Sequence, residues 1–369
     1  MHFLLTERHL QKQQEFRVFA EHELDSSGAF PLQNLKRAAE RGYLGLPLAK
    51  EHGGSGEDFL TYILFIEEIS RVCASSGVII AVHTSVGSFP LHYFGSEAQK
   101  KRYLTRLGKG EMLGAFALTE AHAGSDAAAL TTTARPVKGG YILNGCKLFI
   151  TSSGEADLYT VFATVDPARG RKGITAFLVE KSFQGLSAGK AEKKMGLHRS
   201  QTTELRLEEL FVPVENRLGD EGEGFAIAMS LLDGGRIGIA AQGLGIASAA
   251  LQFSIEQIKA AEAQGKETGQ HKAFLVADLG TRLEGARLLT YQAALLKQME
   301  RRCSREASMA KISATDLAMD SAIRAIEIGG LAALSDPRPA RYFSDAKATQ
   351  IYEGTNQIQR IVVARELLK

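Results

Sequence analysis

The carboxylate of Glu353 stands at a position of the chain that suits a general base. A mostly polar stretch, residues 345–357, leads into a helical run; Gly354 breaks the chain just before it and Thr355 can cap it. The apolar residues that would form one buried face of this run are Ile358, Ile361, Val362 and Leu368. Glu353 is therefore held at a chain break beside the start of a helix, whose dipole helps to keep a carboxylate ionised.

A general base must be fixed, ionised and partly removed from water. The spacing around Glu353 is compatible with these conditions. It also describes a solvated carboxylate in a surface loop, which is the commoner state of a glutamate. The pattern alone leaves both interpretations open.

The cysteines and histidines do not have the spacing of a disulfide framework or a metal site. The three cysteines form no Cys-x-x-Cys pair, which indicates a reducing compartment, and we expect no metal site among the histidines. These residues are Cys73, Cys146 and Cys303, and His83, His92, His122 and His198.

The composition is that of a globular protein of two or three domains. The chain has 369 residues, 44% of them apolar and 23% charged, with a net charge of +2. This charge gives no reason to expect nucleic acid or an anionic membrane as a partner. No window approaches 18 consecutive apolar residues and the first eight residues do not resemble a signal peptide, so we expect no membrane span. A bacterial cytoplasmic protein is preferred, with a mature mitochondrial matrix protein as the alternative.

The periodicity of the chain changes twice and predicts an α+β protein of three domains. Residues 1–111 indicate an N-terminal helical domain, residues 112–213 a middle antiparallel, barrel-like β domain, and residues 214–369 a C-terminal four-helix bundle. Asn144-Gly145 predicts a two-residue hairpin turn within the β domain. The expected strands are 131–137, 141–143, 147–150, 158–164, 174–179 and 204–212, and the expected long helices are 224–259, 286–299 and 307–328.

Four segments, in chain order, resemble the signatures of one enzyme family. Residues 117–126 (Ala-Leu-Thr-Glu-Ala-His-Ala-Gly-Ser-Asp), 149–151 (Phe-Ile-Thr), 232–242 (Leu-Asp-Gly-Gly-Arg-Ile-Gly-Ile-Ala-Ala-Gln) and 350–360 (Gln-Ile-Tyr-Glu-Gly-Thr-Asn-Gln-Ile-Gln-Arg) are similar to motifs of the acyl-CoA dehydrogenases. The segment 232–242 resembles their short-chain, butyryl-CoA form. With a further similar segment at 44–56, the resemblance covers nearly the whole chain.

The resemblance implies FAD-dependent α,β-dehydrogenation of a short-chain acyl-CoA to a trans-2-enoyl-CoA. Glu353 would remove the pro-R α-proton, the β-hydrogen would pass as hydride to flavin N5, and the electrons would go to an electron-transferring flavoprotein. Some family branches carry the base immediately before the Arg of an Asp-x-x-Arg motif. That position is Gly235 in this chain, which favours Glu353.

The resemblance also implies binding roles. Leu118 and Thr119 would contact the flavin pyrimidine, Phe149 would stack on the ring, Thr151 would bond near N5, and Ser125 would lie near the phosphates and the substrate. Without the resemblance, Phe149 is a core aromatic, residues 123–126 are a plain turn, and Asp233 with Arg236 is an intrahelical ion pair. The other residues assigned to FAD are Phe116, Gly124, Ile150, Lys266, Gly329, Gly330, Thr355 and Gln357, and those assigned to the acyl-CoA are Ser125, Asp233, Arg236, Tyr352 and Gly354.

The chain departs from the family pattern where the FAD diphosphate and adenine would bind. Residues 266–269 (Lys-Glu-Thr-Gly) replace Arg-x-x-Phe-Gly-x-Pro, and the segment after them is shorter, so either the loop is rebuilt or the chain lacks residues there. Ile326 stands for a usual Gln ahead of Gly329-Gly330, and Ala332 for a usual Gly. Lysine offers a point charge where arginine offers a two-pronged donor. We therefore expect weaker FAD binding than is usual in the family.

Other functions and assemblies remain open. One alternative is an acyl-CoA oxidase or a dehydrogenase of acyl groups on a carrier protein. Another is a flavin-poor paralogue that serves as a scaffold. The resemblance implies a homotetramer, whereas the altered segment 266–273 leaves a dimer possible.

Overall fold

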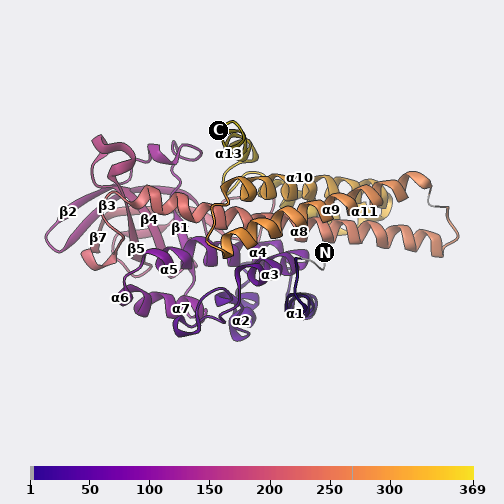
Figure 1. Ribbon diagram of the computed structural model, residues 1–369, viewed down its shortest axis with the longest axis horizontal. Coiled ribbons are helices and arrows are strands. Elements are labelled where there is room, and N and C mark those ends of the chain that lie inside the picture. Colours follow the sequence, from indigo (N-terminus) through magenta and orange to yellow (C-terminus); the bar gives the residue numbers. More distant parts are fainter. Residues whose placement is uncertain (1–3, 268) are drawn as a thin grey trace.

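The computed structural model describes residues 4–267 and 269–369. Residues 1–3 and Thr268 of the altered 266–269 segment lie outside the described residues. In Figure 1 the β-strands gather at one end, long helices extend away from them, and the N-terminal helices lie along one side of both. The α+β class with helical, β and helical parts in chain order is confirmed.

The N-terminal helices are organised around α3 (Phe59–Val72), which is buried on all sides over most of its length. It packs between α1 (Glu7–Glu23) and α8 (Gly224–Ala263). Asp58 caps its first turn by accepting a hydrogen bond from the Thr61 N–H at 2.7 Å. The other helices of this part are α2 (Leu32–Glu40), α4 (Ala74–Val82), α5 (Phe89–Phe94), α6 (Glu97–Gln99) and α7 (Thr105–Gly108).

Two helical stretches are long and apolar enough to cross a membrane by composition alone. They are Ala74–Phe94, in which a π-helical segment joins α4 to α5, and the 40-residue α8. Their most apolar windows are 100% and 83% buried inside the protein. Both stretches therefore belong to the protein's own core.

The β part is one sheet of mixed direction. Its strands follow the order β6-β7-β3-β2-β4-β5-β8, and β1 pairs with β4. Most pairs are antiparallel, whereas β1 and β2 run parallel to β4. The strands are β1 (Gly114–Ala117), β2 (Thr133–Val137), β3 (Gly140–Thr151), β4 (Leu158–Thr164), β5 (Ile174–Glu180), β6 (Leu186–Ala188), β7 (Thr202–Pro213) and β8 (Arg217–Leu218).

The hairpin predicted at Asn144-Gly145 is wrong. Strand β3 runs through this dipeptide without turning and pairs with β7 on both sides of it. The register shifts between Leu143 and Gly145, so the glycine marks a β-bulge. A Cβ atom on Gly145 would come within 2.4 Å of the Thr132 hydroxyl, and this close approach explains the glycine.

The C-terminal helices pack around α8. Gly245 brings α8 against α3, since a Cβ there would lie 2.4 Å from the Glu67 carbonyl oxygen. Gly243 similarly brings α8 against α10 (Ser304–Gly329), whose Ala314 carbonyl carbon would lie 3.0 Å away. These glycines confirm the expected close helix contacts. The remaining helices are α9 (Gln270–Gln298), α11 (Leu331–Ser335), α12 (Pro337–Thr349) and α13 (Asn356–Leu367).

The apolar face predicted for α13 is not buried against this chain. Ile361 is 52% exposed and Leu368, just past the helix, is 86% exposed. The buried residues of α13 are Asn356 and Gln359, which face α10 with amide groups. Asn356 donates to the Thr315 hydroxyl at 2.9 Å and to the Asp316 carboxylate at 2.7 Å. Hydrogen bonds, rather than apolar contacts, therefore hold α13 on the bundle.

Polar contacts of His83 and Asp345 are among those that tie the β part to the helices. His83 accepts a hydrogen bond from the Gly114 N–H at 3.1 Å and donates to the Leu107 carbonyl at 3.2 Å. Burial lowers the pKa of His83 to about 4, so the ring is neutral. On the other side, the Leu197 N–H donates to the Asp345 carboxylate of α12 at 2.5 Å.

Candidate active site

Glu353 lies on the tight turn between α12 and α13. Its φ is +54° and that of Gly354 is +83°, two successive left-handed residues. Left-handed backbone costs about 1–2 kcal/mol for a residue other than glycine. The Asn356 N–H closes the turn on the Gln350 carbonyl at 3.0 Å, and Thr355 caps α13 as expected. The turn thus fixes a strained backbone that directs one carboxylate.

One face of α10 supports this turn. The Lys311 ammonium donates to the Gly354 carbonyl at 2.6 Å and to the Asn356 side-chain oxygen at 3.3 Å. The Gln359 amide donates to the same Gly354 carbonyl at 2.9 Å, and its own oxygen accepts from the Ser308 hydroxyl at 2.9 Å. The turn is therefore attached to the helix bundle at several points.

The Glu353 carboxylate lies against the backbone of α8. A Cβ atom on Gly235 would come within 2.7 Å of the nearer carboxylate oxygen. Burial raises the pKa of Glu353, and the cations of Lys311 and Arg236 lower it in part. Burial also lowers the pKa of Lys311 to about 7. A carboxylate with a raised pKa beside two cations is the arrangement expected of a base that works near neutral pH.

Asp233 and Arg236 form the ion pair that their spacing predicts, with 2.8 Å between the Arg236 guanidinium and the Asp233 carboxylate. The Ser304 hydroxyl holds the other Asp233 oxygen at 2.6 Å. The Arg236 Nε is buried and has no hydrogen-bond partner in the part of the chain that the structure describes. An unsatisfied buried donor is rare. It is available here to a ligand.

Aromatic side chains close the interior behind Glu353. The Tyr352 hydroxyl donates to the Gln242 amide oxygen at 2.5 Å, and the Gln242 amide donates to the Ala74 carbonyl at 2.8 Å. Tyr62 of α3 is completely buried and donates to the Ala81 carbonyl at 3.3 Å. The charge of Glu353 contributes to the raised pKa of this tyrosine. Large side chains, fixed by hydrogen bonds, therefore occupy this space.

Phe149 presents an aromatic face at a second cluster, on the β part. Its φ is +56°, its side chain is 63% exposed, and the β3–β7 register shifts between Lys147 and Ile150. It is therefore not the core aromatic that strand periodicity allows, whereas Ile150 beside it is buried. Exposed aromatic rings on strained backbone are typical of ligand contacts.

The backbone of residues 118–120 lies beside this strand. The Leu148 N–H donates to the Thr119 carbonyl at 2.8 Å, and the Lys147 ammonium donates to the Leu118 carbonyl at 3.2 Å. Gly124 and Ser125 are exposed on the adjoining loop, and a Cβ on Gly124 would meet nothing within 4 Å. Phe149, with open space over the neighbouring loop, fits one side of a flat aromatic cofactor such as the flavin of FAD.

The loop 118–120 is fixed by a buried ion pair that the sequence did not single out. Lys147 is fully buried and its ammonium lies 2.6 Å from the Glu120 carboxylate. That carboxylate also accepts hydrogen bonds from the N–H and hydroxyl groups of Thr131 and Thr132. Burial raises the pKa of Glu120, but Lys147 and these donors outweigh burial and hold it at about 2.

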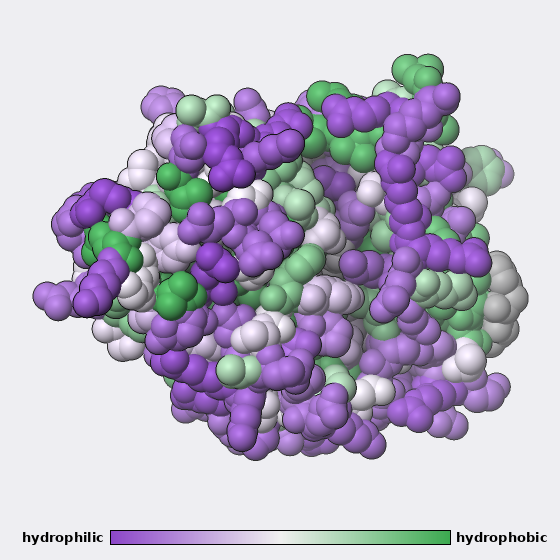
Figure 2. Space-filling view, turned by 60° about the vertical axis from the view of Figure 1, so that its left-hand side comes forward, coloured by the Kyte–Doolittle hydropathy of each residue, from purple (hydrophilic) through white to green (hydrophobic). Residues whose placement is uncertain are grey.

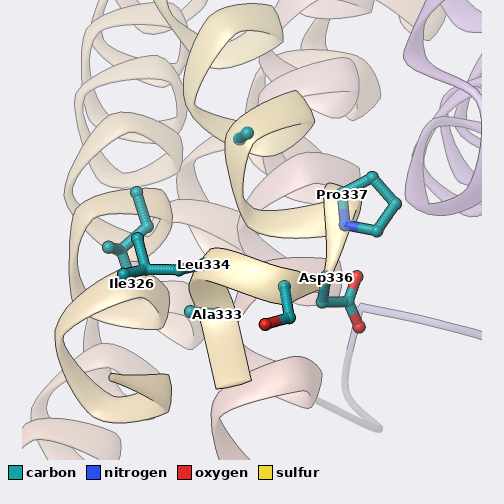
Figure 3. A pocket seen from close by; sticks show the side chains of 7 residues that line it. Ile326, Ala333, Leu334, Asp336 and Pro337 are labelled. Atoms are coloured by element: carbon teal, nitrogen blue, oxygen red, sulfur yellow. The ribbon is translucent and has the colours of Figure 1, made fainter. Parts of the chain in front are cut away.

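The remaining predicted FAD residues lie elsewhere. Gly329 and Gly330 end α10, about 27 Å from Lys311 along a helix that rises 1.5 Å per residue. Lys266 is exposed beyond the end of α8. A pocket opens beside this end of α10, between α10, α11 and the start of α12, where the Ile326, Ala333, Leu334, Asp336 and Pro337 side chains gather (Figure 3). Within a single chain, these residues therefore lie away from Glu353.

The other residues predicted to bind FAD range from buried to exposed. Phe116 is half-buried and its ring packs at a tilt of 59° against that of Phe162, and Leu118 is buried. Thr151 is half-buried, and Gln357 is exposed on the first turn of α13.

Sequence reasoning missed Lys311 and gave no role to Glu120 or Lys147. A signal for Lys311 was present. It is a lone cation on a helix face whose neighbours, Ala307 and Ala314, are small and buried. A charged residue at a core position of a periodic helix requires a polar partner.

The comparisons with known proteins agree over the whole chain. The family models of the acyl-CoA dehydrogenase N-terminal, middle and C-terminal domains match residues 6–111, 115–210 and 222–368. An acyl-CoA dehydrogenase of Bacillus subtilis (strain 168) is 49% identical over 348 residues, 94% of this chain and 92% of that protein.

Solved structures agree too. A chain in the structure of the electron transferring flavoprotein of Acidaminococcus fermentans superposes with a TM-score of 0.97 and 44% identity, covering 100% of both chains. Butyryl-CoA dehydrogenase from Megasphaera elsdenii gives a TM-score of 0.95 and 41% identity, again covering 100% of both chains. The chain belongs to the acyl-CoA dehydrogenase family, whose members are flavin-dependent oxidoreductases.

Proposed function

We propose that this protein oxidises short-chain acyl-CoA thioesters to trans-2-enoyl-CoA with FAD as cofactor and Glu353 as the base. The observation that carries the proposal is the state of the Glu353 carboxylate. It is held on a strained turn beside two cations, and within residues 4–267 and 269–369 no side chain or N–H group donates a hydrogen bond to it. Its oxygens are free to accept a proton from a bound substrate.

Different residues of the chain have different roles in this reaction. The α-proton of the acyl group moves to the Glu353 carboxylate, and the electron pair of that C–H bond becomes the new C=C bond. The backbone N–H of Glu353 is assigned to the thioester oxygen, on which negative charge develops. Arg236, whose Nε has no partner, and Asp233 face the pantetheine arm. FAD, when bound, supplies the hydride acceptor for the β-hydrogen.

The preference for short acyl chains rests on the space behind Glu353. Tyr62 and Gln242 are completely buried there and the Tyr352 hydroxyl is bonded to Gln242, so a longer acyl chain would have to displace bonded side chains. The similarity to butyryl-CoA dehydrogenase from Megasphaera elsdenii supports the same choice. We assign butyryl-CoA as the test substrate.

The partner and the assembly are also proposed. The match to a chain in the structure of an electron transferring flavoprotein supports such a flavoprotein as the electron acceptor. Apolar residues exposed on the single chain support a homo-oligomer, and Figure 2 shows separate apolar patches on an otherwise hydrophilic face. Of the described residues, the three most exposed large apolar side chains are Leu368, Leu331 and Leu334.

The first experiment is an anaerobic titration of the purified protein with butyryl-CoA, followed through the visible flavin spectrum. We expect bleaching, and a loss of bleaching rate of roughly 10²–10⁴-fold in Glu353→Gln, because a general base contributes a factor of that order. Retained bleaching in Glu353→Gln would assign the proton transfer to another group. A flavin that stays oxidised with every short and medium acyl-CoA would refute the substrate class.

A second measurement concerns FAD retention. The Lys266 segment and the ends of α10 and α11 depart from the family pattern, so we expect FAD to be lost on extended dialysis and regained on addition. Full occupancy after dialysis would refute weak binding. Absence of flavin even after FAD is added would favour a scaffold function over the enzyme.

A further inference from the structure

The side chain of Lys311 places an ammonium group in the interior of the helix bundle. The residue is completely buried in α10, and its helical neighbours Ala307, Ala310, Ala314 and Thr315 are completely buried as well. Buried lysines are rare because the charged form loses its hydration. An apolar side chain of the same length would occupy this position at lower cost in free energy. Stability of the bundle therefore does not account for a lysine here.

One of the two hydrogen bonds of Lys311 duplicates another donor. Its ammonium donates to the Gly354 carbonyl and to the Asn356 side-chain oxygen. The Gln359 amide already donates to the Gly354 carbonyl at 2.9 Å. Up to its own pKa of about 7, a lysine adds to this arrangement a positive charge, placed on the turn that carries Glu353.

We propose that Lys311 is the positioning residue of the base: it fixes the turn of Glu353 through the Gly354 carbonyl and supplies the charge that keeps the Glu353 carboxylate ionised between turnovers. This inference rests on the proposed function, in which Glu353 removes the α-proton. It adds a residue on a different helix, which touches the turn rather than the substrate. The pKa of Glu353, raised by burial and lowered in part by Lys311, is consistent with this role.

The charged and titratable groups around the pair come from four elements. Arg236 of α8 acts on both Glu353 and Lys311, and Asp316 of α10 acts on Lys311. Tyr62 of α3 and Tyr352 on the turn adjoin Glu353, and burial keeps both phenols un-ionised by raising their pKa. Among these groups, Lys311 and Arg236 are the two cations that act on Glu353. Arg236 is already paired with Asp233, whereas Lys311 forms no ion pair in the described part of the chain.

The test compares three variants by the pH dependence of flavin reduction. Lys311→Gln keeps a donor near the Gly354 carbonyl and removes the charge, and Lys311→Arg keeps the charge. Ser308→Ala is the matched control, because it removes a hydrogen bond to Gln359 that supports the same turn without involving a charge. The rate constant of reduction by butyryl-CoA is measured in single turnovers from pH 5 to pH 9.

Loss of a cation raises the pKa of a neighbouring carboxylate, by about one unit or more at close range. When the rate constant of flavin reduction is plotted against pH, we expect the midpoint of its rise to move up by about one pH unit in Lys311→Gln. In Lys311→Arg and Ser308→Ala this midpoint should stay at the wild-type value. A role confined to packing would lower the rate at every pH and leave the midpoint in place, and that result would overturn the proposal.

A reciprocal measurement covers the case in which Lys311→Gln does not fold. Coupling between two titrating groups acts equally on both, so the charge of Glu353 must raise the pKa of Lys311. The signal of ¹³Cε-labelled Lys311, identified by its absence in Lys311→Arg, is titrated in the wild type and in Glu353→Gln. A lower Lys311 pKa in Glu353→Gln supports the proposal, and an unchanged pKa overturns it.

The two hypotheses fail in different ways. If Glu353→Gln still reduces its flavin at the wild-type rate, the proposed base is wrong, whatever Lys311 does. If Glu353→Gln is inactive and the midpoint in Lys311→Gln equals that of the wild type, Glu353 remains the base and the inference about Lys311 fails.

Discussion

The carboxylate of Glu353 lies against Gly235 of α8, where a side chain would exclude it. A Cβ atom at Gly235 would come within 2.7 Å of one carboxylate oxygen and 3.1 Å of the other. The preceding glycine, Gly234, differs: its Cβ would meet only the end of the Lys297 side chain, at 3.8 Å. Substituting alanine for each of these two adjacent glycines therefore distinguishes displacement of the Glu353 carboxylate from a general effect on the helix.

Gly235→Ala should reduce turnover strongly without unfolding the protein. The new methyl group displaces the carboxylate, and a shift of about 1 Å at a reacting group costs on the order of 100-fold in rate. Alanine favours a helix over glycine by up to about 1 kcal/mol, so the temperature of the thermal unfolding midpoint should not fall. Steady-state kinetics and thermal unfolding of Gly235→Ala and the control Gly234→Ala test this. Equal losses of turnover in both variants would contradict it.

The raised pKa of Glu353 predicts opposite effects of pH on activity and stability. Activity requires the ionised carboxylate, so the rate should rise as pH increases through the raised pKa. Stability has the opposite sign. A carboxyl group whose pKa is raised by folding contributes stability below its unfolded pKa and loses it as pH rises through the folded pKa.

Glu353→Gln, which cannot ionise, should therefore gain stability relative to the wild type as pH rises above 4.5, the ordinary pKa of a glutamate, and through the raised pKa of Glu353. Denaturant unfolding at several pH values measures the difference, and a difference that does not change with pH would refute the buried, ionised state of Glu353.

The residues that motifs specify could be located from the sequence, and those that packing specifies could not. Glu353 and Thr355 were placed correctly at the chain break, because Gly354 and a capping threonine are local signals. The contact of Gly235 with Glu353 joins residues more than a hundred positions apart; the family resemblance drew attention to Gly235, but residue spacing alone does not report the contact. Lys311 likewise acts through a turn that follows it by over forty residues.

The errors have the same origin. Asn-Gly is a turn signal, yet at Asn144-Gly145 the chain continues as a strand that pairs with β7 on both sides of the dipeptide. In α13 the apolar spacing predicted burial of Ile361, yet the amides of Asn356 and Gln359 face the bundle instead. In both places, contacts distant in sequence outweighed the local preference.

Phe149 should contribute to flavin binding and little to folding. Its ring is 63% exposed, so Phe149→Ala removes little buried surface. A stacked aromatic pair contributes about 0.5–1.5 kcal/mol, which corresponds to an affinity for FAD weaker by up to roughly tenfold. Fluorescence titration of apoprotein with FAD measures the change, with Phe149→Trp expected to retain affinity. The control is Phe211→Ala, an exposed phenylalanine of β7 that is 44% exposed. Equal affinities in Phe149→Ala and the wild type would remove Phe149 from the cofactor site.

Glu120→Gln should destabilise the protein, because it leaves the Lys147 ammonium buried without its counter-charge. Lys147 is fully buried and Glu120 is 7% exposed, and breaking such a pair costs about 3 kcal/mol or more. Burial already lowers the pKa of Lys147 to about 8 with Glu120 present. Without Glu120 the lysine can stay in place only by losing its proton or by drawing in water, and both require free energy.

The double variant Glu120→Gln with Lys147→Met should recover part of that loss, since the buried charge is then removed as well. Urea unfolding measures both variants. Glu97→Gln, which changes a carboxylate side chain that is 84% exposed and paired with Lys100, is the control expected to change stability by less than about 1 kcal/mol. Because the pKa of Glu120 is held at about 2, its contribution to stability should persist above the ordinary carboxyl pKa and be lost only as pH falls toward 2. A loss in Glu120→Gln no larger than that in Glu97→Gln would show that the ion pair does not hold the loop of residues 118–120.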